Sequence, residues 1–166
     1  MTSVPCFYLD TAAVLKRYRT EPGSIVVDEI FDARTSIDAL TTSRFTILEF
    51  TSVARRLFKG RVLKRAAYAS LMARSLAELT SAVSFEPVTD VLIATAVQVA
   101  ERYALRPGDA LQLASALAVR IDRPTTRCVL VTSDRQLLEA ARDAGLDLLD
   151  PESPVAPRVL RQLRAS

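Results

Sequence analysis

The chain has 166 residues, 49% of them hydrophobic and 25% charged, with a formal net charge of +3, which is the composition of a single folded domain. It has no histidine and only two cysteines, which excludes Ser-His-Asp catalysis, histidine-ligated zinc and a disulfide framework. The chemistry left to the chain uses carboxylates, hydroxyls, arginines or a metal ion.

The same composition predicts a cytoplasmic protein. Cys6 and Cys128 fit a reducing cytosol. Each stands among apolar residues of a predicted strand, so we expect both to be buried and reduced in two neighbouring strands. No stretch approaches the ~20 apolar residues that a bilayer requires, and no basic segment precedes the first apolar run as in a signal peptide. We therefore expect no membrane partner.

Strand and helix patterns alternate along the chain. From the N-terminus they predict a strand at 4–9, a helix at 11–18, and a second helix that is capped by Ser24 and runs to about 33. Next come a strand at 36–41, a helix that is capped by Thr42 or Ser43 and runs to 58, and a helix at 61–79. The second half of the chain predicts an edge strand at 83–88, a helix that is capped by Thr89 or Asp90 and runs to 103, and a helix at 107–120. These are followed by a strand at 127–132, a helix that is capped by Ser133 or Asp134 and runs to 143, a strand at 146–149 and a short helix at 158–164. This alternation is typical of an α/β fold with a mainly parallel sheet and helices on both faces.

Four acidic residues are candidates for chemistry, which in such a sheet gathers near the carboxyl ends of the strands. Asp10 ends the first strand, Asp134 follows the fourth, and Asp109 opens a helix. Each of these three could instead be a helix N-cap, the commoner role of an aspartate at a helix start. Glu49 stands among apolar residues inside a predicted helix, where a buried carboxylate requires an arginine or a cation.

Carboxylates without histidine or cysteine form the donor set that a hard cation such as Mg²⁺ prefers. Such an ion polarises a phosphoryl oxygen and activates a water for attack on phosphorus. Thr132 and Ser133, just before Asp134, supply hydroxyls that could orient a carboxylate or a bound water, or simply bond the end of the strand. The sequence therefore favours metal-dependent chemistry on a phosphate ester.

Other α/β proteins that place an aspartate at a strand end are excluded by particular residues. Receiver domains and haloacid-dehalogenase-type phosphatases use a later lysine, but no lysine follows Lys64. Those phosphatases also need an acid two residues after the nucleophile, where this chain has Ala12. A P-loop or dinucleotide fold requires a glycine-rich run, which is absent from a chain with only 4 glycines.

Positive charge is concentrated in one segment. Between Phe50 and Ala77 there are seven basic residues and no acid, whereas the rest of the chain has a net charge of −4. A solvated helix face would show the same pattern, but such a segment can also attract a polyanion by neutralising its phosphates. The residues that we expect to contact RNA or an acidic partner are Arg55, Arg56, Lys59, Arg61, Lys64 and Arg65.

Four segments, taken in order, resemble the motifs of PIN-domain nucleases. The segments around the first, second, third and fourth acids of that family are matched by Tyr8–Tyr18, Thr42–Glu49, Leu105–Ala114 and Val131–Leu137. The likeness covers about residues 4–150 and is greatest to the VapC-like toxins of type II toxin–antitoxin pairs.

The resemblance implies a PIN-like three-layer sandwich whose five strands are ordered 3-2-1-4-5. It implies an endoribonuclease that depends on Mg²⁺ or Mn²⁺ and leaves 5′-phosphate and 3′-hydroxyl ends. The catalytic and metal-binding residues would be Asp10, Glu49, Asp109 and Asp134, and the supporting hydroxyls Thr11, Thr132 and Ser133. It also implies a homodimer and a cognate antitoxin. An amphipathic antitoxin segment would lie between the helices at 42–58 and 61–79 and place an arginine among the acids.

Two residues depart from the family pattern, and other functions remain open. Ala12 stands where a small hydroxyl residue is often found, and Gly108 is an unusual neighbour for the third acid. Residues 1–150 are predicted as the nuclease domain, and 151–166 as a proline-containing tail that the resemblance does not explain. A PIN-like module that binds RNA or protein without cleaving it, or a nuclease for DNA structures, would share the fold. Retention of all four acids argues against the binding module.

Overall fold

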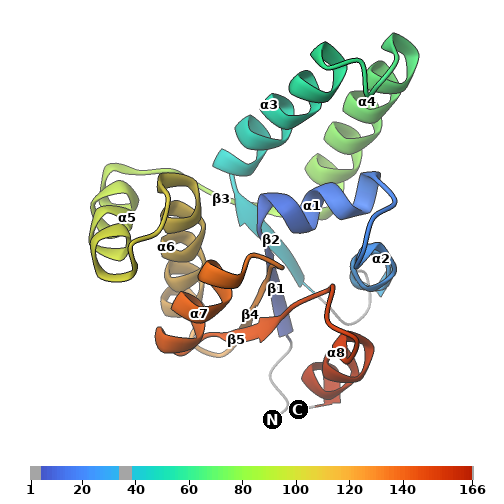
Figure 1. The fold of residues 1–166 in the computed structure, drawn as a ribbon. Helices are drawn as coiled ribbons and strands as arrows, with labels where there is room; N and C mark the ends of the chain where they lie inside the picture. The colour runs from blue at the N-terminus through green and yellow to red at the C-terminus, as the bar shows by residue number, and fades with distance from the viewer. Residues whose placement is uncertain (1–4, 34–38, 166) are drawn as a thin grey trace.

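The computed structural model describes residues 5–33 and 39–165. Within them the strands are β1 (Pro5–Leu9), β2 (Ala39–Ser43), β3 (Ser84–Glu86), β4 (Arg127–Val131) and β5 (Asp147–Leu149). The helices are α1 (Thr11–Tyr18), α2 (Ser24–Ala33), α3 (Phe45–Lys59), α4 (Arg65–Ala82), α5 (Asp90–Tyr103), α6 (Pro107–Asp122), α7 (Arg135–Asp143) and α8 (Ala156–Ala165). Figure 1 shows the strands at the centre, with α3 and α4 extending away from them as a pair.

The strands form one sheet in the order β3-β2-β1-β4-β5, and every neighbouring pair is parallel. This confirms the predicted fold class and strand order. At the carboxyl ends of β1 and β4, Leu9 is the register partner of Val131. The next residues along the two strands, Asp10 and Thr132, are therefore brought side by side at the edge where parallel α/β proteins place their chemistry.

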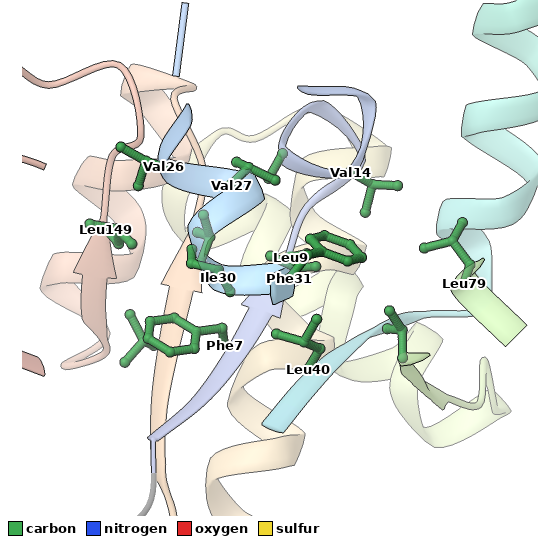
Figure 2. Packing of buried hydrophobic residues seen from close by; sticks show 14 of the residues in the cluster. Phe7, Leu9, Val14, Val26, Val27, Ile30, Phe31, Leu40, Leu79 and Leu149 are labelled. Carbon is green, nitrogen blue, oxygen red and sulfur yellow. The ribbon is translucent and has the colours of Figure 1, made fainter. Parts of the chain in front are cut away.

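Helices cover both faces of the sheet because successive side chains of a strand point in opposite directions. Phe7 and Leu9 of β1 belong to the core shared with α1, α2 and α8, and Figure 2 shows them packed with Ile30 of α2. Cys6 and Tyr8 of the same strand belong to the core shared with α5, α6 and α7. Both faces of β1 are fully buried, as expected for a strand with no polar alternation.

The two cysteines confirm the predicted strand pairing. Cys6 and Cys128 are register partners in β1 and β4. Both are free thiols and both are buried. Burial raises the pKa of each, that of Cys128 to about 12. These residues are therefore small apolar members of the core.

The second strand lies later in the chain than predicted. The prediction was 36–41, whereas β2 spans Ala39–Ser43, and residues 34–38 lie outside the described part of the chain. The strand extends to Ser43 because Thr41, Thr42 and Ser43 pair with β3 in register.

The prediction that Thr42 or Ser43 is the N-cap of the next helix is wrong, because Arg44 occupies that position. The Thr42 hydroxyl donates to the carbonyl of Leu9 at 2.6 Å and so connects β2 to β1. The Ser43 hydroxyl accepts a hydrogen bond from the amide of Phe45 at 3.1 Å, but the residue belongs to the strand. Helix α3 begins at Phe45, and the residue at its N-cap, Arg44, makes no side-chain capping bond.

The helix predicted at 61–79 begins four residues later, at Arg65, and continues to Ala82. Arg61 has a φ of 59°, a left-handed conformation that interrupts the helix. The amides of Val62 and Leu63 donate instead to the carbonyl of Leu57 and close a turn. This turn makes α3 and α4 an antiparallel pair (Figure 1).

The remaining caps follow the sequence more closely. Thr89 caps α5 and Asp134 caps α7, each through its side-chain oxygen. Gly145, at a φ of 77°, ends α7 in the left-handed conformation that glycine adopts most readily. Ser24 is the first residue of α2 rather than its cap, and its hydroxyl accepts a hydrogen bond from the amide of Glu21.

Residues 151–165 are packed against the rest of the fold. Leu160 and Leu163 of α8 are buried in the core that contains α2. The Lys16 ammonium, on α1, donates to a carboxylate oxygen of Glu152 at 2.6 Å. Within the described residues, no helix is both long and apolar enough to cross a membrane.

Candidate active site at the sheet edge

A pocket of about 610 Å³ opens beyond the carboxyl ends of β1 and β4. It is formed by residues from α1, α3, α6 and the β4–α7 connection. All four predicted acids line it: Asp10, Glu49, Asp109 and Asp134. The fold thus brings together in one cavity four carboxylates that are far apart in the sequence.

Asp10 is the most deeply buried of the four, with 5% of its surface exposed. It caps α1, because its Oδ1 accepts a hydrogen bond from the amide of Ala13 at 2.6 Å. Its Oδ2 accepts a second one from the hydroxyl of Thr132 at 2.5 Å. Burial raises the pKa of Asp10 to about 6 despite these two hydrogen bonds, and the nearby charge of Asp109 adds to the rise. Asp10 therefore both caps α1 and lines the pocket.

Asp134 is the third residue after β4 and is exposed. Its Oδ1 accepts from the amide of Leu137 at 2.9 Å, which caps α7. Its own amide donates to the hydroxyl of Thr132 at 3.1 Å. One buried threonine therefore contacts both the first and the fourth acid.

Asp109 lies in the first turn of α6 and is not its cap. The N-cap position belongs to Arg106, and Pro107 is the first helical residue. The N-cap interpretation left open for Asp109 is therefore wrong. Its carboxyl is half-buried, and its pKa is raised by burial and then by the charges of Asp134 and Glu49. Asp109 is thus repelled electrostatically by both Asp134 and Glu49.

Glu49 projects from the second turn of α3 and is held by neutral donors. Its Oε2 accepts from the hydroxyl of Thr11 at 2.5 Å and from the side-chain amide of Gln112 at 3.1 Å. The sequence predicted an arginine or a cation as its partner. Its Oε1 lies against Gly108, where a Cβ atom would come within 2.7 Å of it. The unusual glycine before the third acid therefore leaves room for the second acid.

Three buried polar residues of the site were missed by the sequence analysis. The Tyr8 hydroxyl donates to Oε1 of Gln112 at 2.7 Å, and Nε2 of Gln112 lies 3.0 Å from the hydroxyl of Thr46. A signal was available in the spacing. Gln112 is three residues after Asp109, and Thr46 is three before Glu49, so each shares a helix face with an acid.

The predicted hydroxyls divide between two roles. Thr11 and Thr132 bond directly to acids of the pocket. Ser133 instead donates to Oδ1 of Asp150 at 2.9 Å, on the β5 side. Ala12 lines the pocket without a hydroxyl. The two threonines supply hydroxyl contacts to the first and second acids despite that departure.

The predicted basic contacts lie on and beyond α3, and all of them are exposed: Arg55, Arg56, Lys59, Arg61, Lys64 and Arg65. Only Arg56 among these six also lines the acidic pocket, and it donates to the Ser52 hydroxyl at 2.7 Å. The Arg55 guanidinium lies over the Phe58 ring, 5.1 Å from its centroid. The segment is thus a solvated basic surface that starts at the rim of the pocket.

The donor set of the pocket fits a hard divalent cation. The charge of Asp109 raises the pKa of Asp10, and the charges of Asp134 and Glu49 raise the pKa of Asp109, so a bound cation would relieve these repulsions. In the part of the chain that the structure describes, however, no three histidine, cysteine, aspartate or glutamate side chains stand close enough to hold one ion together. A cation that keeps several of its waters, as Mg²⁺ does, suits carboxylates spread over a cavity of this size.

Comparison with known proteins identifies the family of this chain. A family model described as PIN domain matches residues 7–143, a span that contains all four acids. No curated protein matches the chain significantly.

Several solved structures have the same fold. The crystal structure of PAE2754 from Pyrobaculum aerophilum is 22% identical with a TM-score of 0.59 and covers 100% of both chains. VapBC2 from Rickettsia felis, bound to a DNA fragment from their promoter, is 14% identical with a TM-score of 0.59, over 86% of this chain and 96% of that one. FitAcB from Neisseria gonorrhoeae is 18% identical with a TM-score of 0.58, over 87% of this chain and 97% of that one. At these identities the likeness establishes the fold.

Proposed function

Because the chain belongs to the PIN domain family, we propose that it is an endoribonuclease that depends on Mg²⁺ or Mn²⁺. The observation that carries the proposal is the single pocket lined by four carboxylates from four parts of the chain. A pocket with this charge repels a phosphodiester unless a cation is present. A divalent ion would supply positive charge where Asp109 lies close to Asp134 and Glu49.

In this proposal Asp10, Glu49, Asp109 and Asp134 hold one or two divalent ions. When bound, such an ion neutralises charge on the scissile phosphate and makes water a better nucleophile at neutral pH. The protein supplies the geometry. Thr132 fixes the carboxylate of Asp10, whose burial strengthens its attraction for a cation because the surroundings are poorly polarisable.

The basic surface on α3 gives the RNA a place to lie. Arg56 is at the rim of the pocket, so a phosphate next to the scissile one would meet it first. Arg55 and Lys59 follow on the same helix, about 9 and 15 Å further along its axis than Glu49 at the helical rise of ~1.5 Å per residue. Exposed arginines and lysines at these distances neutralise backbone phosphates without reading sequence.

We also propose that the protein is the toxin of a type II toxin–antitoxin pair and forms a homodimer. The sequence resembles VapC-like toxins, and the fold is that of chains in the VapBC2 and FitAcB structures. A groove of about 250 Å³ lies between the end of α1 and α4 rather than between α3 and α4 as expected, and Leu63, Ala67 and Leu71 line it together with Arg19 and Arg74. Apolar residues in a groove suit an amphipathic antitoxin segment. Co-purification with the product of an adjacent small reading frame, weakened by Ala67→Asp in the groove, would support the pairing. Sedimentation as a monomer at micromolar concentration would contradict the dimer.

A cleavage assay tests the nuclease. We expect the purified protein to cut single-stranded RNA in Mg²⁺ or Mn²⁺, to leave 5′-phosphate ends, and to stop when EDTA is in excess. Asp10→Asn should lower the rate at least about 100-fold, more than is typical for a residue that only supports a ligand. Glu139→Gln, an exposed carboxylate of α7 outside the pocket, is the matched control and should keep full activity.

Three results would change the proposal. Full RNA cleavage in excess EDTA would rule out the metal mechanism. Cleavage of structured DNA but not of RNA would reassign the substrate. Binding of RNA without cleavage of either nucleic acid would favour the binding-module alternative.

A further inference from the structure

A buried side-chain amide links four parts of the fold directly beneath the acidic pocket. Gln112 of α6 is 2% exposed. Its Oε1 accepts a hydrogen bond from the hydroxyl of Tyr8 at 2.7 Å. Its Nε2 lies within 3.0–3.1 Å of three acceptors, which are the hydroxyls of Thr11 and Thr46 and Oε2 of Glu49. The amide therefore connects β1, α1 and α3 to α6.

Tyr8 determines which way the amide faces. Its hydroxyl is fully buried and is directed at the side-chain amide of Gln112. The amide oxygen of Gln112 accepts from that donor, and its NH₂ group consequently points toward Glu49. With the amide reversed, its oxygen would face a carboxylate oxygen and the attraction would become a repulsion.

Glu49 is thereby restricted on both of its oxygens. Gln112 and Thr11 donate to Oε2, and the backbone at Gly108 lies against Oε1. Thr11 is itself bonded to the amide, so a displacement of Gln112 would disturb both donors of the carboxylate. The rotamer of this acid depends on an amide that lies behind the pocket.

We propose that Gln112 is a positioning residue for the acidic pocket, oriented by Tyr8, which holds the Glu49 carboxylate where it receives a divalent cation. This inference rests on the proposed metal-dependent function. Gln112 lines the pocket, but its role is exerted through Glu49 and Thr11 rather than through contact with the cation.

A purely structural role explains the observations less well. The neighbouring positions on α6 hold Leu111 and Leu113, so the core at this depth accepts apolar residues. A buried amide is unfavourable unless it is fully hydrogen-bonded. Two of the acceptors that satisfy Gln112 are Thr11 and Glu49, both of which line the pocket. The pocket residues that it contacts, rather than the packing of the core, therefore explain why a glutamine occupies this position.

A double-mutant cycle on Mn²⁺ affinity tests the proposal. Binding is measured on the full chain by the loss of the free Mn²⁺ signal in electron paramagnetic resonance, without RNA. Gln112→Met keeps the size of the side chain and removes its hydrogen bonds, and we expect it to weaken Mn²⁺ binding by about 10-fold or more. In the Glu49→Gln background the same substitution should change affinity by less than about twofold, because the group through which it acts is gone.

Tyr8→Phe provides a milder second variant. It keeps the buried ring and removes only the hydroxyl that orients the amide. We expect a smaller loss of Mn²⁺ affinity that also vanishes in the Glu49→Gln background. Ser75→Ala, which removes a buried hydroxyl of α4 outside the pocket, is the matched control and should leave Mn²⁺ affinity unchanged.

The outcomes separate this proposal from the proposed function. Equal losses with and without Glu49→Gln, or unchanged affinity in both Gln112→Met and Tyr8→Phe, would overturn the positioning role while leaving the nuclease intact. A wild-type protein that binds no Mn²⁺ would overturn it as well. Normal coupling in a protein that cleaves no RNA would instead keep the positioning role and refute the substrate.

Discussion

Two strand-to-helix junctions of this protein, β1–α1 and β4–α7, have the same local design and different surroundings. In each, an aspartate after the strand caps the following helix by accepting a hydrogen bond from the amide three residues later. Asp10 is buried, and its pKa is raised to about 6. Asp134 is exposed at the rim. One capping motif thus produces two acids in very different environments.

The difference arises from the number of residues between the end of each strand and its aspartate. Asp10 is the first residue after β1, whereas Asp134 is the third after β4. Because Leu9 and Val131 are register partners, Thr132 takes the place beside Asp10 that an acid one residue after β4 would have taken. Its hydroxyl donates to Asp10 and accepts from the amide of Asp134. A difference of two residues in the connection converts a buried acid into an exposed one.

The largest expected contrast is in cation affinity and cleavage. Asp10→Asn should reduce Mn²⁺ affinity at least about 100-fold, and Asp134→Asn about 10-fold, because a charge acts more strongly on a cation where water is excluded. Both substitutions keep a side chain that can cap a helix. Mn²⁺ titration of the two variants, with RNA cleavage measured in parallel, checks the order. Equal losses would show that burial does not set the contribution of each acid.

A second contrast concerns stability and pH. A carboxyl whose pKa is raised by folding destabilises the folded state when it is ionised. This penalty is absent below the unfolded pKa of 3.8, grows as the pH rises, and is complete above about 6. In EDTA, Asp10→Asn should therefore stabilise the protein by about 3 kcal/mol at pH 8 and not at pH 3.5. Denaturant unfolding at the two pH values measures this. A gain in stability at pH 3.5 as large as at pH 8 would contradict the assignment.

Thr132 links the two junctions, so its removal should affect both. Thr132→Val leaves Asp10 without one donor and the Asp134 amide without its acceptor. We expect a loss of about 1–3 kcal/mol in the free energy of unfolding. Thr132→Ser retains the hydroxyl and should restore most of it. A valine variant as stable as the wild type would mean that water replaces the hydroxyl.

The smallest effect is expected deeper in the same two strands. Cys6 and Cys128 are buried register partners, and burial raises the pKa of both thiols. A thiol reagent should therefore label neither within the time that labels the unfolded chain. Labelling at equal rates in the native and unfolded protein would contradict the pairing of β1 with β4.

The sequence by itself determined the features that depend on neighbours along the chain. The α/β alternation, the caps of α5 and α7 and the end of α7 at Gly145 follow from periodicity and from contacts between residues three or four apart. Asp10 and Asp134 were also identifiable, because the carboxyl ends of predicted parallel strands meet at one edge. The likeness to known motifs added the strand order, which local patterns do not contain.

The tertiary structure alone decided how deeply each acid lies and what holds it. The Thr132–Asp10 bond joins residues 122 positions apart, and the Gln112–Glu49 bond joins residues 63 apart. Such pairs depend on strand register and on the packing of α3 against α6, and periodicity carries no trace of either. The start of α4 after Arg61, with its φ of 59°, was likewise set by a turn that closes onto Leu57. Side-chain type predicted which groups the site contains, and only the packed fold determined their depth, their partners and hence their charge.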